Sequence, residues 1–311
     1  MDQLRLRAVS RTQGNNRALK AGEVAREEFA LDFEEVPVLV QAFRRMVRTL
    51  EFDVCEMAVT TYLTAKEHGV AFTALPVFLV RGFHHGAVVR PAAAELRPED
   101  LAGRRVGVNR GYTVTTGVWA RAILREEHGI DLDAVTWVPS GDEHVQAYEP
   151  PPNVTPAPGT DLAAAVVGGD LAAAVGLEPD RPELAPLIPD AEEAGYAALK
   201  QRGHYPINHL VVVRDELLAA HPDLAASLFA AFTESKRRYV ATLDDLPEPT
   251  PADRMHRRVR DITGTDPLPY GLEPNWAVLE ELARAAVDQH ILTRAPDLEA
   301  MFAPGTHGLV G

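Results

Sequence analysis

The sequence predicts an α/β protein that is built from two lobes. Strand-like and helical patterns alternate along the chain up to about residue 213, and this alternation starts afresh after Pro91. Beyond Arg214 nearly all of the chain has a helical pattern. Because 46% of the 311 residues are hydrophobic, the chain can bury the core that two lobes require.

The first lobe is expected to begin with a strand, because residues 4–10 alternate between polar and apolar side chains. Apolar residues at i, i+4 spacing over residues 38–50 predict an amphipathic helix, and Pro37 ends the strand before it. The elements expected after residue 10 are a helix at 23–29, a strand at 31–36, the helix at 38–50, a strand at 52–57, a helix at 60–68, and strands at 71–78 and 83–89.

The second lobe repeats the alternation, and a segment with five prolines at 148–159 is expected to be irregular surface chain. Its expected elements are strands at 105–109, 135–139 and 171–177 and helices at 113–128 and 161–167. A strand at 205–213 returns from it, and helices at 215–220, 223–243, 253–262 and 275–289 form the tail.

The helical tail must pack on one of the lobes, which predicts a discontinuous arrangement. We expect 1–88 to form the first part of lobe one, 89–209 to form lobe two, and 210–311 to return to lobe one with the C-terminal helices. The segments 83–89 and 205–213 are expected to pair as crossing hinge strands, which is the plan of periplasmic binding proteins.

Charge and cysteine content narrow the functional class. The formal net charge is −14, and such a surface repels nucleic-acid phosphates and anionic lipid head groups. The single cysteine, Cys55, cannot form an intrachain disulfide. The start of the chain lacks a secretory pattern, and no apolar run reaches the roughly 18 residues of a membrane span. We therefore expect a soluble, cytoplasmic protein with neither nucleic-acid nor membrane partners, and leave homo-oligomerisation open.

Six collinear segments together resemble the 4,5-dihydroxyphthalate decarboxylase family. They are residues 51–57 (EFDVCEM), 74–85 (ALPVFLVRGFHH), 103–108 (GRRVGV), 112–119 (YTVTTGVW), 206–209 (PINH) and 270–275 (YGLEPN). The resemblance implies the two-lobed fold of type 2 periplasmic binding proteins. It also implies cofactor-independent, non-oxidative decarboxylation of a hydroxylated aromatic carboxylic acid, a small-molecule partner, and no organic cofactor.

The chain departs from the family pattern near the expected pocket. The family typically reads Arg-Val-Phe-Arg-His-Ser where this chain reads RGFHHG over residues 81–86, so that His84 replaces an arginine and Gly86 a serine. Asn208 stands where the family has an apolar residue. These changes leave open a biosynthetic enzyme of the same fold that acts on a different aromatic acid. A separate alternative, from another functional class, is a solute-binding protein for a small anion.

Decarboxylation of a hydroxylated benzoate needs a base near the phenol, an acid over a ring carbon, and donors that hold a carboxylate. Strand alternation over 81–87 would put Arg81 and His85 on one face and His84 on the other. The family match selects His85 for proton transfer and Arg81 as carboxylate clamp, and we expect His84 and Asn208 at the substrate. The alternative is that Arg81 is a surface cation and the two histidines are an ordinary pair at a strand end.

Two further groups are candidates. Tyr112, Thr113, Thr115 and Thr116 precede or open a helix, where free amides and hydroxyls can bind a carboxylate or phenolate, although helix capping alone would explain them. Glu56 and His209 are expected near the hinge, where the carboxylate could orient His85 or His209 and the histidine could transfer a proton. Alternatively, Glu56 caps the helix that follows Val59.

Other polar residues carry weaker signals. Glu273 and Asn275 are expected to cap the last long helix rather than bind a ligand, and Cys55 is expected to be a buried, inert thiol. No metal-ligand spacing occurs in the sequence, so no metal is expected. A zinc site assembled from His85, His209 and Glu56 is not excluded by spacing.

Overall fold

A computed structural model describes residues 3–311, which divide into two compact units. Unit 1 comprises the residues up to Arg81 together with Ile207–Leu279 and Pro296–Gly311, and unit 2 comprises Gly82–Pro206 and Glu280–Ala295. The boundaries expected from the sequence were 88/89 and 209/210. The observed ones are 81/82 and 206/207, and residues 280–295, which we expected in lobe one, belong to unit 2.

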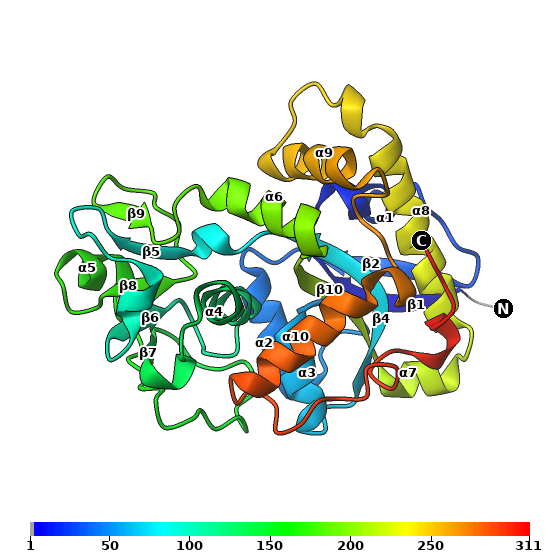
Figure 1. The fold of residues 1–311 in the computed structure, drawn as a ribbon. Coiled ribbons are helices and arrows are strands. Elements are labelled where there is room, and N and C mark those ends of the chain that lie inside the picture. Colours follow the sequence, from blue (N-terminus) through cyan, green and yellow to red (C-terminus); the bar gives the residue numbers. More distant parts are fainter. Residues whose placement is uncertain (1–2) are drawn as a thin grey trace. The chain divides into compact units, whose positions relative to one another are not determined.

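Unit 1 contains a five-stranded sheet in the order β2-β1-β3-β10-β4. Strand β1 pairs in parallel with β2 and β3, whereas β10 is antiparallel to both β3 and β4 (Figure 1). The strands are β1 Leu4–Val9, β2 Phe29–Glu34, β3 Val54–Ala58, β4 Phe72–Arg81 and β10 Ile207–Arg214. All five residues of β3 are buried, as expected for a strand with neighbours on both sides.

Helices flank this sheet, and most of them begin within two residues of the expected position. They are α1 Arg17–Lys20, α2 Leu39–Thr49, α3 Val59–Glu67, α7 Asp215–Ala220, α8 Leu224–Ala241, α9 Pro251–Thr263 and α10 Trp276–Asp288, the last of which contains the boundary between the units. The helix expected at 23–29 is absent from the described chain, because Phe29 instead starts β2 and pairs with Leu4. Strand pairing here overrides the local helical preference.

Unit 2 repeats the plan of unit 1 with a second five-stranded sheet in the order β7-β6-β8-β5-β9. Strand β6 is parallel to β7 and β8, and β5 is antiparallel to β8 and β9. The strands are β5 Val88–Pro91, β6 Arg105–Val108, β7 Thr136–Pro139, β8 Ala173–Val175 and β9 Leu184–Pro186. The helices are α4 Thr115–His128, α5 Leu162–Val167 and α6 Ala191–Arg202, of which α6 and strand β9 were not expected.

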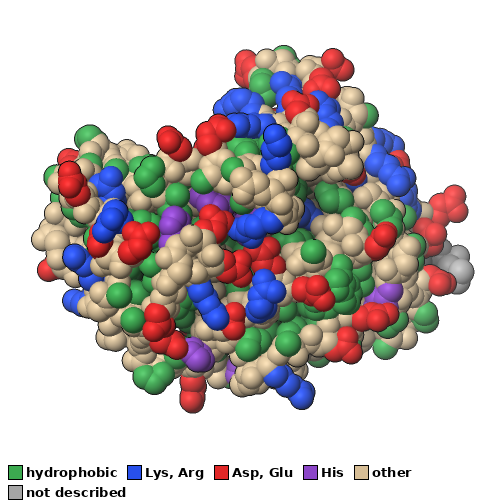
Figure 2. Space-filling view, in the orientation of Figure 1, with side chains coloured by type: hydrophobic (Ala, Val, Ile, Leu, Met, Phe, Trp, Pro, Cys, Tyr) green, Lys and Arg blue, Asp and Glu red, His purple; other side chains and the backbone are tan. Residues whose placement is uncertain are grey.

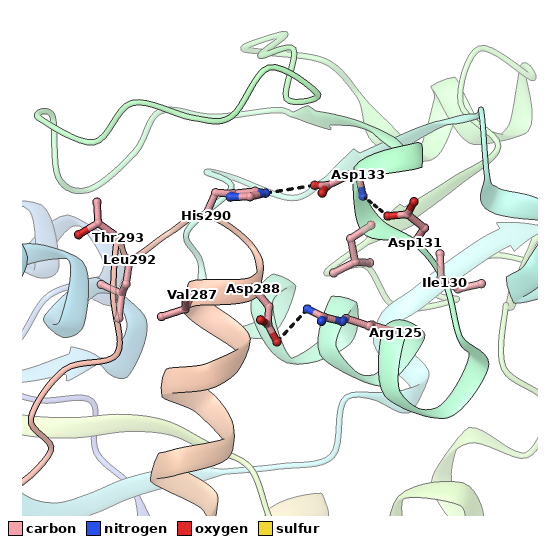
Figure 3. A pocket seen from close by; sticks show the side chains of 10 residues that line it. Arg125, Ile130, Asp131, Asp133, Val287, Asp288, His290, Leu292 and Thr293 are labelled. Carbon is pink, nitrogen blue, oxygen red and sulfur yellow. Dashed lines mark hydrogen bonds and ion pairs between the residues drawn. The ribbon is translucent and has the colours of Figure 1, made fainter.

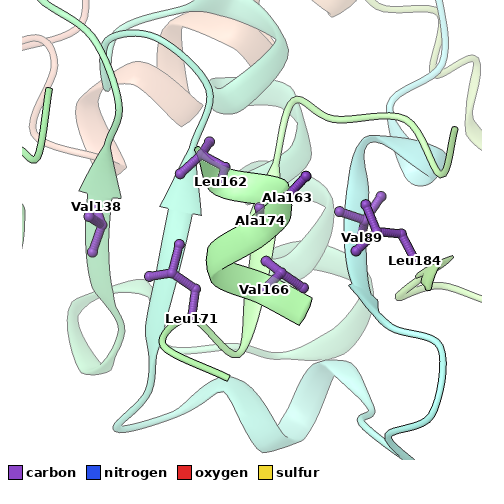
Figure 4. Packing of buried hydrophobic residues seen from close by; sticks show 8 residues of the cluster. All are labelled: Val89, Val138, Leu162, Ala163, Val166, Leu171, Ala174 and Leu184. Atoms are coloured by element: carbon purple, nitrogen blue, oxygen red, sulfur yellow. The ribbon is translucent and has the colours of Figure 1, made fainter. Parts of the chain in front are cut away.

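One apolar cluster of unit 2 joins helix α5 to the sheet beneath it (Figure 4). Val166 from α5 is fully buried with Leu171, and Val89, Val138 and Ala174 come from three strands of the sheet. Burying such side chains stabilises the unit by roughly 1.5–3 kcal/mol each. Leu162, Ala163 and Leu184 complete the cluster.

The hinge pairing that we expected from the sequence is wrong. Residues 85–87 form a 3₁₀ helix rather than a strand, and β5 begins only at Val88 and pairs with β8 and β9. The strand that pairs with β10 is β4, which extends to Arg81. Because residues 82–87 are not a strand, alternation does not separate the two histidines, and both His84 and His85 are buried.

The remaining short elements are 3₁₀ helices at Gly14–Asn16, His85–Ala87, Pro98–Leu101, Leu132–Ala134, Leu243–Asp245, Glu273–Asn275 and Pro304–Thr306. Among residues 3–311, no helix combines the length and the apolar character that crossing a membrane would require. Acidic and basic side chains are interspersed over the face drawn in Figure 2 rather than gathered by sign.

Candidate active site

The site residues expected from the sequence form two sets, one in each unit. Unit 1 contains Glu56, Arg81, Asn208 and His209. Unit 2 contains His84, His85, Tyr112, Thr113, Thr115 and Thr116. Each set is described by itself below.

Sheet register brings Glu56 and His209 together. In the antiparallel pair of β3 and β10, Glu56 lies opposite Val211 and His209 lies opposite Ala58. Opposed residues share a face of the sheet, and so do residues two apart on one strand, so Glu56 and His209 are diagonal neighbours on one face. Diagonal neighbours are within reach of a long side chain and a ring.

The Glu56 carboxylate is fully buried and accepts hydrogen bonds on both oxygens. Oε1 lies 2.7 Å from Nδ1 of His209, and Oε2 accepts from the Ser10 hydroxyl at 2.7 Å and from the Arg11 amide at 2.9 Å. Burial alone would raise the pKa of Glu56, but the bonds and charge from His209 and the Ser10 hydroxyl lower it below its ordinary value. Glu56 is therefore ionised at neutral pH, and it does not cap α3.

His209 is oriented by this carboxylate and by an irregular stretch of its strand. The register between β10 and β4 shifts on both sides of His209, and such bulges re-aim side chains. The His209 ring lies edge-on to Phe43, with 5.2 Å between the ring centres. Of the His209 side chain, 19% is exposed. Because an ionised carboxylate only accepts, Nδ1 carries the proton, and Nε2 is left as the basic nitrogen. Asn208 beside it is half-buried.

Arg81 is buried, so the alternative of a surface cation is wrong. Its guanidinium donates to Oδ1 of Asn275 and to the carbonyl of Pro269. Asn275 was expected to cap a helix, but its amide instead donates to the carbonyls of Pro269 and Gly271, at 3.0 and 2.8 Å. Asn275 thus ties the end of β4 to the segment that precedes α10.

In unit 2, His85 forms a second pair with a glutamate. Its Nε2 lies 3.1 Å from both carboxylate oxygens of Glu127 on α4, and the imidazole has no exposed surface. Nδ1 is buried and has no hydrogen-bond partner among residues 3–311. Burial opposes ionisation of Glu127, but the bonds and charges of His85 and Arg202 outweigh it and lower the pKa of that carboxyl to about 2.

A third pair adjoins this one. Nδ1 of His204 lies 2.8 Å from Oε1 of Glu281, and Arg202 donates to Glu281 at 3.1 Å and also to Glu127. The rings of His85 and His204 meet edge-on with their centres 6.0 Å apart. We did not predict Glu127, His204 or Glu281 as partners of His85, because they lie far apart in sequence and no local motif links them. His84 is buried beside His85.

The segment before α4 binds a carboxylate, as the amide and hydroxyl pattern indicates, but the carboxylate belongs to the chain itself. The amides of Tyr112 and Thr113 and the hydroxyl of Thr113 all donate to Glu143. The first residues of the helix, Thr115 and Thr116, are buried and half-buried. The alternative of capping alone finds no support, since the residue at the N-cap position is Val114.

The other candidates offer little chemistry. Burial raises the pKa of the Cys55 thiol, which is fully buried, and the thiol donates to the carbonyl of Glu56. Within the described residues, no three His, Cys, Asp or Glu side chains are grouped so that they could hold a metal ion.

A cavity of about 670 Å³ lies in unit 2 beside the end of α10 (Figure 3). Its two cationic candidates already have acidic partners. Arg125 lies 2.8 Å from Asp288, and His290 lies 3.2 Å from Asp133. None of the expected site residues lines this cavity.

Comparison with known proteins decides the family. No protein-family model matches the chain. A 4,5-dihydroxyphthalate decarboxylase from Comamonas testosteroni is 30% identical over 287 residues, which cover 86% of each chain. The chain belongs to the 4,5-dihydroxyphthalate decarboxylase family. A second member, from Pseudomonas putida, is 34% identical over 111 residues, 35% of this chain and 43% of that one. The resemblance seen in the six segments is thereby confirmed.

Solved structures confirm the expected fold of this family member. The periplasmic aliphatic sulphonate-binding protein SsuA from Escherichia coli has a TM-score of 0.57 and 12% identity, and the match covers 97% of this chain and 92% of that one. A Candida albicans protein with the generic periplasmic-binding-protein fold has a TM-score of 0.53 and 11% identity over 100% and 99% of the two chains. The two-lobed α/β architecture is therefore that of periplasmic binding proteins.

Proposed function

We propose that this chain is a non-oxidative decarboxylase of a hydroxylated aromatic carboxylic acid and that His209, held by Glu56, transfers the proton. Family membership supports the reaction class. The observation that carries the assignment within the chain is the 2.7 Å contact between the buried Glu56 carboxylate and Nδ1 of a partly exposed imidazole. Such a contact fixes the tautomer and leaves Nε2 free to accept a proton.

The reaction can proceed with the groups of this site and the substrate hydroxyl. Nε2 of His209 accepts the phenolic proton, and Glu56 stabilises the resulting imidazolium. The phenolate pushes electron density into the ring, and the imidazolium returns the proton to the carbon that bears the carboxylate. The bond to that carboxylate then breaks, its electron pair restores the aromatic phenolate, CO₂ leaves, and water reprotonates the phenolate. A hydroxyl ortho to the carboxylate lets one imidazole serve both steps.

This mechanism requires no organic cofactor and no metal, because the substrate hydroxyl itself supplies and takes back the electron density. We therefore propose cofactor-independent chemistry, as the family resemblance implied.

The position of Glu56 and Ser10 supports a ligand site here. Ser10 follows β1 directly and Glu56 lies within the neighbouring parallel strand, and ligands of open α/β sheets bind outside the carboxyl ends of such strands.

His209 is preferred to His85 for proton transfer on the basis of exposure. The His85 imidazole has no exposed surface, whereas 19% of the His209 side chain is exposed. A catalytic base must come within hydrogen-bond distance of the proton it removes. In this proposal, Glu56 is a positioning residue for His209.

The experiment is CO₂ release from a panel of hydroxybenzoates, dihydroxybenzoates and hydroxylated phthalates, run in D₂O with EDTA-treated protein. We expect CO₂ and a phenol in equal amounts, with one deuterium on the carbon that lost its carboxylate. Binding of the panel, seen as a thermal shift, without CO₂ from any member would contradict the enzyme proposal and favour capture of a small anion.

A further inference from the structure

We infer that Glu143 is an internal carboxylate that occupies a carboxylate-binding site of unit 2 and competes with carboxylate ligands for it. The site, here called the cradle, consists of Tyr112 and Thr113 between β6 and α4. The Tyr112 amide donates to Oε1 of Glu143 at 2.5 Å. The Thr113 amide and hydroxyl donate to Oε2 at 3.2 and 2.6 Å. Each carboxylate oxygen thus has its own donor, so the cradle fits a carboxylate in two-point fashion.

Glycine at position 111 makes room for this carboxylate. A Cβ atom at Gly111 would lie 2.5 Å from Oε2 of Glu143, closer than such atoms approach in proteins. The space in front of the donors is therefore built to the size of a carboxylate, and a larger residue at position 111 would fill it.

A buried arginine behind the cradle supplies an independent reason for an anion there. Arg121 has no exposed surface, and its Nε and Nη2 donate to Gln289 and to the Tyr112 carbonyl, each at 2.7 Å. Its Nη1 lies 3.0 Å from where a Cβ of Gly117 would be, in the first turn of α4, and has no hydrogen-bond partner within residues 3–311. Its guanidinium stacks on Tyr112 with 3.9 Å to the ring centre.

A buried charge without an opposite charge is costly. Both hydrogen-bond acceptors of Arg121 named above are neutral. Burial lowers the pKa of Arg121, and its electrostatic interactions with Tyr112, Tyr148 and Glu143 oppose that shift in part. The anion in the cradle thus acts as counter-charge to Arg121. An incoming carboxylate could replace the Glu143 carboxylate without changing the local charge, whereas a neutral group could not.

Glu143 is placed so that it can leave. It is half-buried and lies in the stretch of residues 140–161 between β7 and α5, which forms neither helix nor strand. An incoming carboxylate would take over the same three donors. Only the molecules in which Glu143 has left the cradle can bind the ligand, and this lowers the apparent affinity. Glu143 would therefore select ligands whose carboxylate reaches the donors of both Tyr112 and Thr113, which makes it a specificity-determining residue.

The test is the affinity of Glu143→Ala for phthalate, measured by calorimetry without turnover. We expect Kd to fall at least 10-fold relative to the wild type, whereas Glu149→Ala, which changes an exposed glutamate of the same segment, should leave Kd unchanged. Acetate should raise the melting temperature of Glu143→Ala more than that of the wild type, and chloride at equal ionic strength should not. Glu143→Gln, which keeps the size and removes the charge, should give a smaller gain.

Unchanged or weaker phthalate binding by folded Glu143→Ala, without rescue by acetate, would overturn the inference and leave Glu143 as a purely structural partner of Tyr112 and Thr113. The identity of the ligand as a substrate rests on the proposed function, but the two can fail separately. Tighter phthalate binding by Glu143→Ala in a chain that releases no CO₂ supports the inference and contradicts the enzyme. CO₂ release with no gain in affinity contradicts the inference alone.

Discussion

The pairs Glu56–His209 in unit 1 and Glu127–His85 in unit 2 use the same two residue types with opposite burial. In unit 1 the carboxylate is fully buried and 19% of the histidine side chain is exposed. In unit 2 the histidine is fully buried and 26% of the glutamate side chain is exposed. The exposed member of each pair determines its use: an accessible imidazole can exchange protons with a ligand, and a buried one can only hold its neighbours.

The partners of the two carboxylates reinforce this difference. Glu56 is fixed by the Ser10 hydroxyl and the Arg11 amide, so its position does not depend on the histidine that it orients. Glu127 is shared between His85 and Arg202, both in unit 2, and joins α4 to the end of α6. We interpret the first pair as chemical and the second as structural. Four substitutions test that comparison.

The largest effect is expected from His209→Asn. Removing the proton-transfer group should lower kcat by on the order of 10²-fold or more, the usual contribution of a positioned acid or base, while KM changes little. Steady-state CO₂ release measures this effect. If His85→Asn lost turnover while His209→Asn kept it, the two pairs would have their roles exchanged.

Glu56→Gln is expected to have the next largest effect. The amide can still accept from one donor, but it no longer fixes the His209 tautomer or stabilises the imidazolium, so kcat should fall about 10-fold or more. The pH at which kcat reaches half of its maximum should shift to a lower value, because the imidazolium loses its anionic partner. An unchanged pH profile would show that Glu56 acts only in packing.

His85→Asn should act on stability rather than on turnover. Shortening a fully buried side chain that bonds Glu127 should lower the free energy of unfolding by about 1–3 kcal/mol. Urea unfolding measures this change, and kcat below the transition should remain within about 3-fold of the wild type. His68→Asn offers a control, since that histidine is exposed.

Glu127→Gln should give the smallest effect, and one that depends on pH. The folded-state pKa of Glu127 is lowered from 4.5 to about 2, so the unfolded chain binds the proton more readily. The stabilisation is therefore complete above pH 4.5 and is lost as the pH falls towards 2. The difference in unfolding free energy between wild type and variant should be about 1 kcal/mol at pH 6 and should shrink towards pH 3. A difference independent of pH would contradict the charged pairing.

Several features could be predicted because they depend on short stretches of chain. The amphipathic stripe of α2 and the alternation in β1 are both local patterns, and the elements appear where these patterns place them. The hinge failed for a local reason too. Residues 83–89 look like a strand, but the backbone turns through a 3₁₀ helix at 85–87, so the rule that separates His84 from His85 does not apply.

By itself, the sequence determined the α/β class, the two-lobed plan and the family, because collinear segments and periodic patterns are properties of neighbouring residues. Only the tertiary structure decided the partners. The register of β3 and β10 brought Glu56 within hydrogen-bond distance of His209. The packing of α4 and α6 brought His85 and Arg202 within hydrogen-bond distance of Glu127. The chain also placed Glu143 in the cradle, 30 residues from Thr113. Such pairs join residues that are distant in sequence, and the energy that selects them, burial of charge with its counter-charge, exists only once the chain has folded.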